Sequence, residues 1–507
     1  MLLSQALELL GGEPFAFFWM ALGVVVGIVF GAIPGLSATM AIAIFLPVTY
    51  GLSSVEGMAC LIGLFVGGIS GGLISAILLN IPGTPSSVAT CFDGRPMALK
   101  GQADKALGAA IVFSFFGTLF GIAALVFIAP MLASVAIKFG PHEYFAITFF
   151  SISLVITLAS DSLLKGLMTG LLGMVFAMVG LDQIEASARF TFDVRSVRSG
   201  FNVLTVLIGL YAITEVLTNC ENAGDTADAE VQSVTMRGWG ISLKEALGQG
   251  VNFVRSSVIG LVIGILPGIG GGTSNIVAYT VAKNQSRHPE RFGTGELSGV
   301  VASEAANNAG IGGAMIPLLT LGIPGDTATA MLLGGLMIHG ITPGPLIFQS
   351  NGDLMYAIFI LLLAASFTML VAEFFGLKGF IKVLKVPKYY LLPVIVVLCG
   401  VGAFGLNSRV FDIGSVLFFG VVGYVLVKCK YPLPPMILGF ILEPILEVNL
   451  RRGLTSSQGD FSEFFTRPIS GVVIGLTLIF IVYSLFKVRR SHTSAAGQEE
   501  QCGQARN

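Results

Sequence analysis

The sequence predicts an all-α polytopic membrane protein, and three observations support this fold class. Of the 507 residues, 54% are hydrophobic and 11% are charged, whereas a soluble domain carries about 25% charged residues. Apolar stretches of about 20 residues, long enough for a transmembrane helix, recur along the chain. These stretches do not alternate in polarity as barrel strands do, so helices remain as the element that satisfies its own backbone in lipid.

The apolar stretches follow one another from the N-terminal region almost to the C-terminus. Pro-Gly pairs interrupt several of them, so we expect about 10 to 14 transmembrane or re-entrant helices. No basic residue precedes Arg95, so the N-terminal stretch does not have the pattern of a cleavable secretory signal. The stretches lie at 15–50, 57–80, 107–137, 143–160, 163–181, 200–218, 255–282, 299–323, 326–340, 354–377, 389–406, 410–427, 432–448 and 468–486.

Polarity also divides the chain into segments. The expected segments are a first membrane repeat with flanking helices (1–218), a polar linker (219–250), a second repeat core (251–350), C-terminal membrane helices (351–490) and a disordered cytoplasmic tail (491–507). The tail follows Lys487, Arg489 and Arg490, which predict a cytoplasmic C-terminus by the positive-inside rule. The net charge of −1 provides no basic field for nucleic acid.

An internal repeat relates the two halves. The pattern Gly27-x-x-x-Gly31-x-x-Pro34-Gly35 recurs 233 residues later as Gly260-x-x-x-Gly264-x-x-Pro267-Gly268. A second motif, Ile81-Pro-Gly83, recurs 242 residues later as Ile323-Pro-Gly325. Two motifs in the same order at nearly the same spacing indicate a duplicated unit. The Gly-x-x-x-Gly pairs are typical of close helix packing.

Loop charges predict that the two repeats have inverted topology. The loop after the first motif, 51–57, carries Glu56 and no basic residue, whereas the matching loop of the second half carries Lys283, Arg287 and Arg291. After the second motif the charges exchange: the first half has Arg95, Lys100 and Lys105, and the second half has Asp353. Because basic loops prefer the cytoplasm, matching loops are expected on opposite sides, the pattern of secondary transporters.

The helix breaks are the expected binding site. A Pro-Gly break inside the membrane frees backbone N–H groups at the start of the next half-helix, and these groups attract anions. Small and hydroxylated residues follow each break, so we expect 34–39, 82–87, 267–275 and 324–329 to line one polar cavity for a carboxylate. The candidate substrate contacts are Gly35, Ser37, Thr39, Gly83, Thr84, Ser86, Ser87, Gly268, Gly270, Gly271, Thr273, Ser274, Asn275, Gly325, Thr327, Asn307 and Asn308.

Two acidic residues are candidates for cation coupling. Glu304 lies within an apolar run, where an ionisable residue is by default a functional hypothesis. Cation coordination or proton coupling is one role for it, and helix capping or an interfacial position is the alternative. Asp326 follows Pro324-Gly325 and either caps the next half-helix or binds the coupling cation, Na⁺ or H⁺. No cofactor or metal site is expected. The roles of Glu443, Arg451 and Arg452 stay open, with a structural ion network as one reading.

Several long motifs resemble one family, the large membrane subunit of the tripartite tricarboxylate transporters. The resemblance extends over about residues 15–455, nearly the whole chain. Glu443 departs from it, since the family carries a small residue there, and position 326 varies between Ser and Asp. The motifs are Ile33-Pro-Gly-Leu36, Phe45-Leu-Pro-Val-Thr49, Asn80-Ile-Pro-Gly83, Asp93-Gly-Arg-Pro-Met97, Leu266-Pro-Gly-Ile-Gly-Gly-Gly272, Ala278-Tyr279, Ser286-Arg-His-Pro-Glu-Arg-Phe-Gly293, Glu304-Ala-Ala-Asn-Asn-Ala309, Leu321-Gly-Ile-Pro-Gly325, His339-Gly-Ile-Thr-Pro-Gly-Pro345 and Leu446-Glu-Val-Asn-Leu-Arg-Arg452.

The resemblance implies a permease of the bacterial inner membrane that works with two partners. One is a small membrane subunit, and the other is a periplasmic solute-binding protein that captures the substrate. It implies import of a small carboxylate, such as citrate or a related organic acid, driven by an ion gradient. The sequence agrees on the energy source, since it has no Gly-x-x-x-x-Gly-Lys-Ser/Thr phosphate loop.

Other readings remain open at this stage. One alternative is an anion channel, and another is a transporter of a different organic anion class that works without a binding protein. A scaffold for partner subunits is a third. An intramembrane enzyme would need a nucleophile with its base, or paired acids with metal ligands, and no such set is visible because the four histidines are isolated.

Overall fold

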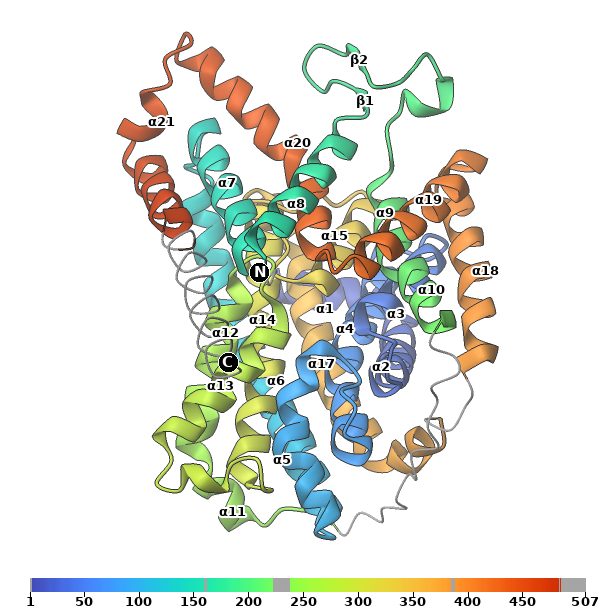
Figure 1. Cartoon of the computed structure of the whole chain (residues 1–507), viewed down its shortest axis with the longest axis vertical. Coiled ribbons are helices and arrows are strands. Elements are labelled where there is room, and N and C mark those ends of the chain that lie inside the picture. Colours follow the sequence, from blue (N-terminus) through green and yellow to red (C-terminus); the bar gives the residue numbers. More distant parts are fainter. Residues whose placement is uncertain (1, 159–161, 222–237, 384–387, 483, 485–507) are drawn as a thin grey trace, which may run out of the picture. The chain divides into compact units, whose positions relative to one another are not determined.

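The computed structural model describes residues 2–158, 162–221, 238–383, 388–482 and 484, and these are almost entirely helical (Figure 1). The strands of this described part, β1 (Gly180–Leu181) and β2 (Ala188–Arg189), form a short antiparallel hairpin. The all-α fold is therefore confirmed. Half of the expected polar linker, 222–237, and the whole expected tail, 491–507, lie outside the described residues.

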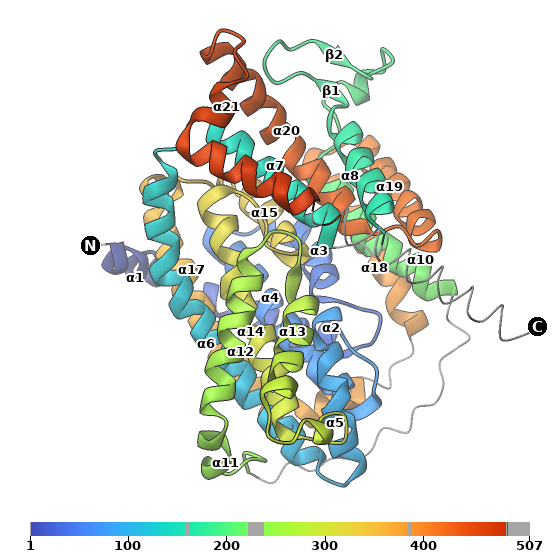
Figure 2. The ribbon, with the colours of Figure 1, turned by 60° about the vertical axis from the view of Figure 1, so that its left-hand side comes forward.

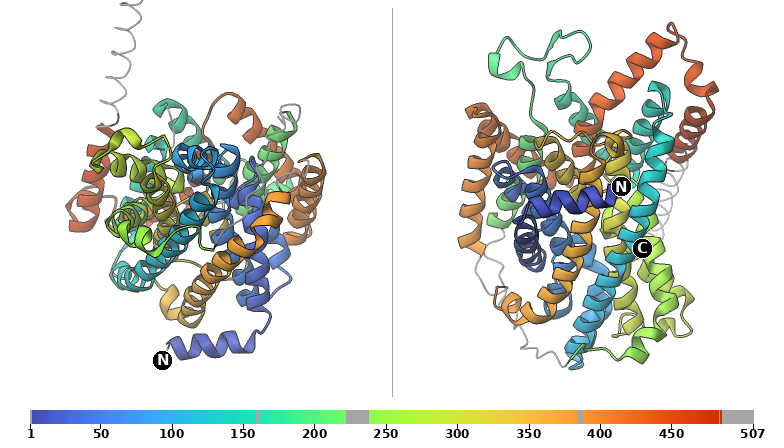
Figure 3. Two further views of the ribbon diagram at one scale, coloured as in Figure 1. Left: turned by 90° about the horizontal axis from the view of Figure 1, so that it is seen from below. Right: turned by 180° about the vertical axis from the view of Figure 1, so that it is seen from behind.

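Several helices are long and apolar enough to cross a membrane, which confirms a polytopic membrane protein. Among the described residues six helices meet this criterion, or up to seven if α1 (Leu2–Gly12) and α2 (Ala16–Ala32), bent by 84°, form one span. Figure 3 shows α1 turned away from the helix that follows it. Further apolar helices of 10–17 residues flank the Pro-Gly breaks or lie elsewhere in the chain. A break divides one hydrophobic stretch into two shorter helices. The number of helices long enough to cross a membrane is therefore smaller than the number of hydrophobic stretches in the sequence.

The chain folds as two compact units, each described here by itself. The first comprises Met1–Ile137 and Phe201–Lys428, and the second comprises Lys138–Gly200 and Cys429–Asn507. Both repeats lie in the first unit. Its first repeat consists of α2, α3 (Ala38–Thr49), α4 (Ser54–Leu79), the 3₁₀ turn η1 (Pro85–Ser87), α5 (Val88–Leu99) and α6 (Ala103–Ala136).

The second repeat has the same element order. It consists of α12 (Gly250–Ile265), α13 (Gly270–Gln285), α14 (Leu297–Leu321), α15 (Thr327–Ile338) and α17 (Gly352–Val383), with the short η5 (Pro289–Arg291) and α16 (Ile347–Ser350) between them. The remaining described helices of the first unit are α1, α9 (Val203–Leu207), the π-helical turn η3 (Ile208–Ile213), α10 (Thr214–Glu221), α11 (Leu243–Gly248), α18 (Lys388–Asn407) and α19 (Val410–Lys428).

Glycine packing follows the same register in both repeats. A methyl group on Gly27 of α2 would lie 2.6 Å from the carbonyl oxygen of Leu64 in α4. Its counterpart Gly260 in α12 faces the carbonyl oxygen of Ala306 in α14, which lies 242 residues after Leu64. Gly31 and Gly264 likewise face the carbonyls of Gly68 and Gly310. The Gly-x-x-x-Gly pairs therefore pack helices closely, as expected.

The two repeats also exchange their last helices. The helix α6 of the first repeat packs along α14 of the second, and α17 of the second packs along α4 of the first. Figure 2 shows α6 beside α12 and α14. The central helices α4 and α14 are buried along most of their length, so their small and polar residues face protein.

The second unit contains α7 (Pro141–Leu158), α8 (Leu163–Ala177), the hairpin, η2 (Arg195–Val197), α20 (Leu433–Ser456), α21 (Glu463–Thr466) and a final apolar helix, Pro468–Val482. An ion network joins the hairpin to α20. Arg189 donates to both carboxylate oxygens of Glu447, at 2.9 and 2.8 Å. Arg451 donates to Asp182 at 2.7 Å and pairs with Glu185. Glu447 and Arg451 thus take part in a structural ion network.

Candidate binding site at the four helix breaks

Breaks 1 (33–37) and 3 (266–269) have matching backbone conformations. The residues Ile33 and Leu266 are extended and end α2 and α12. The glycines of the two Pro-Gly pairs, Gly35 and Gly268, have φ of +85° and +75°. Only glycine adopts this region at no steric cost, which explains why it follows the proline in both repeats.

Breaks 2 (80–87) and 4 (322–326) match in the same way. A left-handed residue ends each preceding helix, Asn80 with φ of 58° after α4 and Gly322 with φ of 72° after α14. Gly325 then approaches the carbonyl oxygen of Gly264 so closely that a Cβ atom would lie 2.6 Å from it, and Gly83 meets the carbonyl oxygen of Gly31. These glycines are needed for close approach.

The four breaks form one cluster. Breaks 3 and 4 are joined by a hydrogen bond of 2.8 Å from the Gly268 N–H to the Gly325 carbonyl. The helices that follow breaks 1 and 4 meet where the hydroxyls of Thr39 and Thr327 lie 3.0 Å apart. Break 2 meets α13, the helix that follows break 3, where the Asn275 side-chain amide donates to the Ser86 carbonyl. Together with the contact of Gly83 on Gly31 of α2, each break or its adjoining helix touches two others.

Side chains already satisfy several of the freed amides. The Ser37 hydroxyl accepts from the Met40 N–H at 3.2 Å and caps α3. The Asp326 carboxylate accepts from the Thr329 N–H at 2.7 Å and so caps α15. Capping was one of the two roles expected for Asp326. In break 2, the hydroxyls of Thr84 and Ser86 lie 3.0 Å apart and the Ser87 hydroxyl donates to the Thr84 carbonyl at 2.9 Å.

The N-terminus of α13 differs from those of α3 and α15, which Ser37 and Asp326 cap. Its N-cap position is Ile269, which provides no side-chain cap, and the helix opens with Gly270, Gly271 and Gly272. The amide N–H groups of its first turn therefore have no side-chain acceptor of their own. Such a terminus, with its positive dipole end, is suited to an anionic group.

A small cavity lies directly at this terminus. Its volume is about 10 Å³, enough for one water-sized sphere and too small for a carboxylate. Asn307 is 2% exposed, and its side-chain oxygen has no hydrogen-bond partner among the described residues. The buried side-chain oxygen of Asn275 is also without a partner there. The cavity is lined by Phe65, Ile69, Gly264, Gly270, Gly271, Ser274, Asn307, Gly310, Ile311, Ala314 and Asp326.

Other expected contacts lie away from this cavity. The side chain of Asn308 accepts from the Thr118 hydroxyl of α6 at 3.2 Å. The buried Glu304 carboxyl accepts from the Ser114 hydroxyl at 2.9 Å and contacts Thr90 of α5. The side chain of Thr273 is exposed. Gly270, Gly271, Ser274 and Asn307 are thus the expected substrate contacts that line the cavity, with Asp326 beside them.

Sequence reasoning missed several polar residues close to the breaks. Tyr211, in the π-helical turn η3, places a buried hydroxyl near Thr327 and Asp326. Asn219 of α10 donates to the Gly35 carbonyl of break 1 at 2.9 Å. Glu373 of α17 is fully buried, and neither of its carboxyl oxygens has a hydrogen-bond partner among the described residues. Glu373 did have a sequence signal, because it is the one acidic residue between Asp353 and Asp412.

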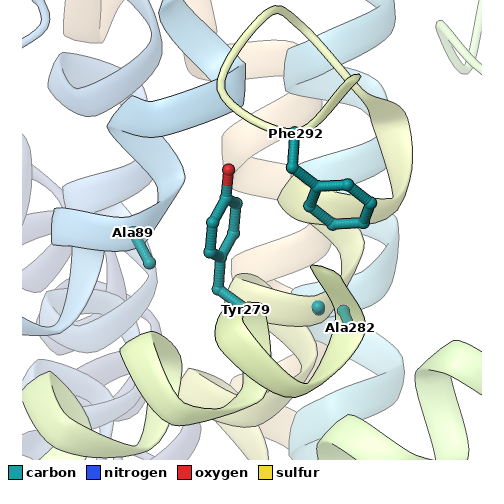
Figure 4. Packing of buried hydrophobic residues seen from close by; sticks show 5 residues of the cluster. Ala89, Tyr279, Ala282 and Phe292 are labelled. Atoms are coloured by element: carbon teal, nitrogen blue, oxygen red, sulfur yellow. The ribbon is translucent and has the colours of Figure 1, made fainter. Parts of the chain in front are cut away.

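Two motifs of the sequence meet beside α13 rather than in the cavity. One oxygen of Asp93 accepts from the N–H groups of Gly293, Gly295 and Glu296 at 2.7–2.9 Å. Its other oxygen accepts from the Tyr279 hydroxyl at 2.9 Å. Figure 4 shows Tyr279 standing between Ala89 of α5 and Phe292. Asp93 therefore fixes the loop after α13 against α5 of the other repeat.

The comparisons with known proteins agree with this architecture. Residues 17–438 match the family described as "Tripartite tricarboxylate transporter TctA family". The chain belongs to this family. A protein of Agrobacterium vitis, named "Uncharacterized 52.8 kDa protein in TAR-I ttuC' 3'region", is 34% identical over 487 residues, 96% of each chain. A second, "Uncharacterized protein in TAR-II ttuC' 3'region", is 35% identical over 232 residues, 46% of this chain and 96% of the relative. No solved structure matches.

Membership of the TctA family points to a transporter rather than an enzyme, and its tripartite name implies partner subunits. It places the break cluster in a multi-pass membrane protein. The repeat-related contacts described above then belong to the core of that transporter.

Proposed function

We propose that this chain is the permease subunit of a tripartite carboxylate transporter. It imports a small carboxylate, citrate or a related organic acid, across the bacterial inner membrane by symport with Na⁺ or H⁺. A periplasmic solute-binding protein delivers the substrate, and a small membrane subunit completes the complex. The C-terminus lies in the cytoplasm.

The uncapped N-terminus of α13 inside the break cluster is the observation that carries this proposal. A carboxylate bound there receives hydrogen bonds from the first amides of α13, with Ser274 and the amide group of Asn307 lining the same cavity. No buried arginine is required, because the helix terminus provides the positive potential. Asp326 also lines the cavity, where a Cβ on Gly270 would lie 3.5 Å from its Cβ, and its carboxylate already caps α15.

Repeat symmetry supports alternating access. The contact of Thr39 with Thr327 joins α3 to α15, and the equivalent positions of the other pair, Gly272 and Pro85, also meet: a Cβ on Gly272 would lie 3.3 Å from the Pro85 carbonyl oxygen. Reciprocal contacts of this kind are those of a two-fold interface. With the exchanged loop charges, they favour inverted repeats that open the central site to either side in turn.

The cavity also indicates which step is required for transport. A volume of about 10 Å³ does not admit a carboxylate of several carbon atoms. The first turn of α13 must therefore separate from break 2 and α14 when substrate enters. Gly271 is the point of closest approach, since a Cβ there would lie 2.9 Å from both the Asn307 side-chain oxygen and the Ser86 Cβ.

Uptake of labelled citrate into proteoliposomes tests the proposal. The vesicles contain the full chain with its small membrane subunit, and the binding protein is added outside. We expect accumulation against the citrate gradient when a Na⁺ or pH gradient is imposed, and counterflow exchange without one. Conduction that never exceeds equilibration and shows no counterflow would indicate a channel instead.

Omission of the binding protein separates the remaining alternatives. The proposal expects accumulation to fall to background without it. Undiminished accumulation would indicate a transporter that works without a binding protein, and the absence of any uptake by the complete complex would favour a scaffold.

A further inference from the structure

Two buried carboxyl groups, Glu304 of α14 and Glu373 of α17, lie within the first unit and are each 0% exposed. Glu373 is close enough to Glu304 for the two to act on each other electrostatically. Among the described residues, no Lys, Arg or His forms an ion pair with either carboxyl. In the second unit, by contrast, the carboxylates of Asp182 and Glu447 form ion pairs with arginines.

Hydrogen-bond counting indicates the protonation state of Glu304. The Thr90 hydroxyl contacts both Glu304 and the Ser303 hydroxyl, the latter at 3.0 Å, and Ser303 donates to the Val300 carbonyl at 3.0 Å. Each hydroxyl has one proton, so two hydroxyls cannot supply three hydrogen bonds. The missing proton is provided when Glu304 is a neutral acid that donates to Thr90, which then donates to Ser303.

The environment of Glu373 leads to the same state. Both of its oxygens are buried without a hydrogen-bond partner among the described residues, and so is the hydroxyl of the neighbouring Ser70 in α4. An ionised carboxylate in that position would have no hydrogen-bond donor and no cationic side chain among the described residues, an arrangement that proteins avoid by neutralising the group. A neutral carboxyl has a proton that it can donate to the neighbouring Ser70 hydroxyl.

Glu304 is linked to the cavity through Asn307, and Glu373 is linked to it through Ser70 and Ile69. Asn307, which lines the cavity, has its side chain beside the Glu304 carboxyl. Ile69, which also lines the cavity, precedes Ser70, and its carbonyl accepts from the Asn307 amide at 3.4 Å. Two other titratable groups face this region. They are the Cys91 thiol of α5, which interacts electrostatically with Glu304, and Asp326 of α15.

We propose that Glu304 and Glu373 are the proton-carrying pair of this transporter, both protonated in the conformation with the closed cavity. This rests on the proposed function and makes H⁺ the coupling ion. Opening of the cavity admits water to the two acids, so each releases its proton on the cytoplasmic side and binds another on the periplasmic side. Glu373 is the new member of the pair, and Ser70 positions it.

Infrared spectroscopy of the purified full chain tests the protonation states without reference to transport. We expect a carboxylic acid C=O absorption at neutral pH that shifts in D₂O. Part of it is lost in Glu373→Gln and part in Glu304→Gln, whereas the exposed control Glu8→Gln leaves it unchanged. A wild-type spectrum without this absorption at neutral pH would overturn the proposal, even if a variant failed to fold.

Proteoliposome transport tests the coupling. In the complete complex we expect a pH gradient to drive citrate accumulation by the wild type. Glu373→Gln is expected to lose accumulation and to retain counterflow exchange, and Glu8→Gln is expected to match the wild type. Accumulation by Glu373→Gln equal to the wild type, or wild-type accumulation driven by Na⁺ alone, would reject the proton pair. A wild-type complex with no uptake of any carboxylate would instead reject the proposed function, whatever the infrared result.

Discussion

The hydroxyls of Thr39 and Thr327 lie 3.0 Å apart although the two residues are separated by 288 positions in the chain. Each belongs to the first turn of the helix that follows a break, Thr39 to α3 of the first repeat and Thr327 to α15 of the second. Their contact shows that helices broken in different repeats begin at the same place. Movement of one repeat relative to the other must change this contact.

Asn307 and Asn308 provide a matched pair for the binding site. We expect Asn307→Ala to raise the KM for citrate about tenfold, which corresponds to about 1.4 kcal/mol, because Asn307 lines the cavity and its side-chain oxygen has no partner in the described part of the chain. Asn308→Ala is expected to leave KM near the wild-type value, since Asn308 contacts Thr118 of α6 instead. Uptake kinetics in proteoliposomes measure both. Equal effects of the two variants would argue against the cavity as the site.

Asp326 tests helix capping against cation binding. A serine also caps a helix, so Asp326→Ser is expected to retain uptake, and Asp326→Ala is expected to lower the stability of the chain by about 1 kcal/mol. Thermal unfolding in detergent and uptake in vesicles give the two readouts. Loss of uptake in a well-folded Asp326→Ser variant would indicate that Asp326 binds the coupling cation.

Glycine at position 325 is required for the close approach of break 4 to α12 and α14. A Cβ there would lie 2.6 Å from both the Gly264 carbonyl oxygen and the Ala314 Cα. We expect Gly325→Val to insert into the membrane and to abolish citrate uptake, with a stability loss of about 1–3 kcal/mol from overpacking. The control is Gly475→Val, since a Cβ on Gly475 meets nothing within 4 Å. Wild-type uptake by Gly325→Val would remove this break from the mechanism.

Acid should weaken the second unit through Asp182. Hydrogen bonds from the backbone N–H groups of Glu185 and Ile184, together with Arg451 and Arg189, lower the pKa of Asp182 from 3.8 to about 2. A carboxyl whose pKa is lowered by folding stabilises the folded state above its unfolded pKa and loses this effect as the pH falls through the folded value. The stabilisation is therefore complete above about pH 5 and is lost between about pH 4 and pH 2.

Comparison with Asp182→Asn isolates this effect. The wild type should melt at a higher temperature than the variant near neutral pH, and the difference should shrink as the pH falls from 4 towards 2. A difference that does not change with pH would show that Asp182 acts by packing alone.

The repeat and the breaks could be predicted from the sequence because proline and glycine have strong local effects. Proline fixes φ at Pro34 and Pro267, and glycine permits the positive φ of Gly35 and Gly268. These effects are local, so the sequence alone predicts the breaks. The capping of α15 by Asp326 was one of two roles that the sequence allowed. Local chemistry could not choose between them.

Contacts between distant segments could not be predicted in the same way. Thr90 and Ser114 reach Glu304 from positions 214 and 190 residues away. The placement of Asn308 against Thr118, outside the cavity, depends on how α6 packs along α14. Glu373 was overlooked because it lies outside every repeated motif, although an acid within an apolar run is itself a signal.

A disulfide across the break cluster tests whether these helix starts must separate during transport. The double variant Thr39→Cys/Thr327→Cys is made with Cys220, Cys429 and Cys502 replaced by serine, and each single variant serves as a control. Citrate uptake by the complete complex is measured before oxidation, after it and after reduction. Because the closed cavity of about 10 Å³ cannot hold citrate, we expect oxidation to block uptake in the double variant and reduction to restore it. Undiminished uptake by the cross-linked protein would contradict a substrate path through the break cluster.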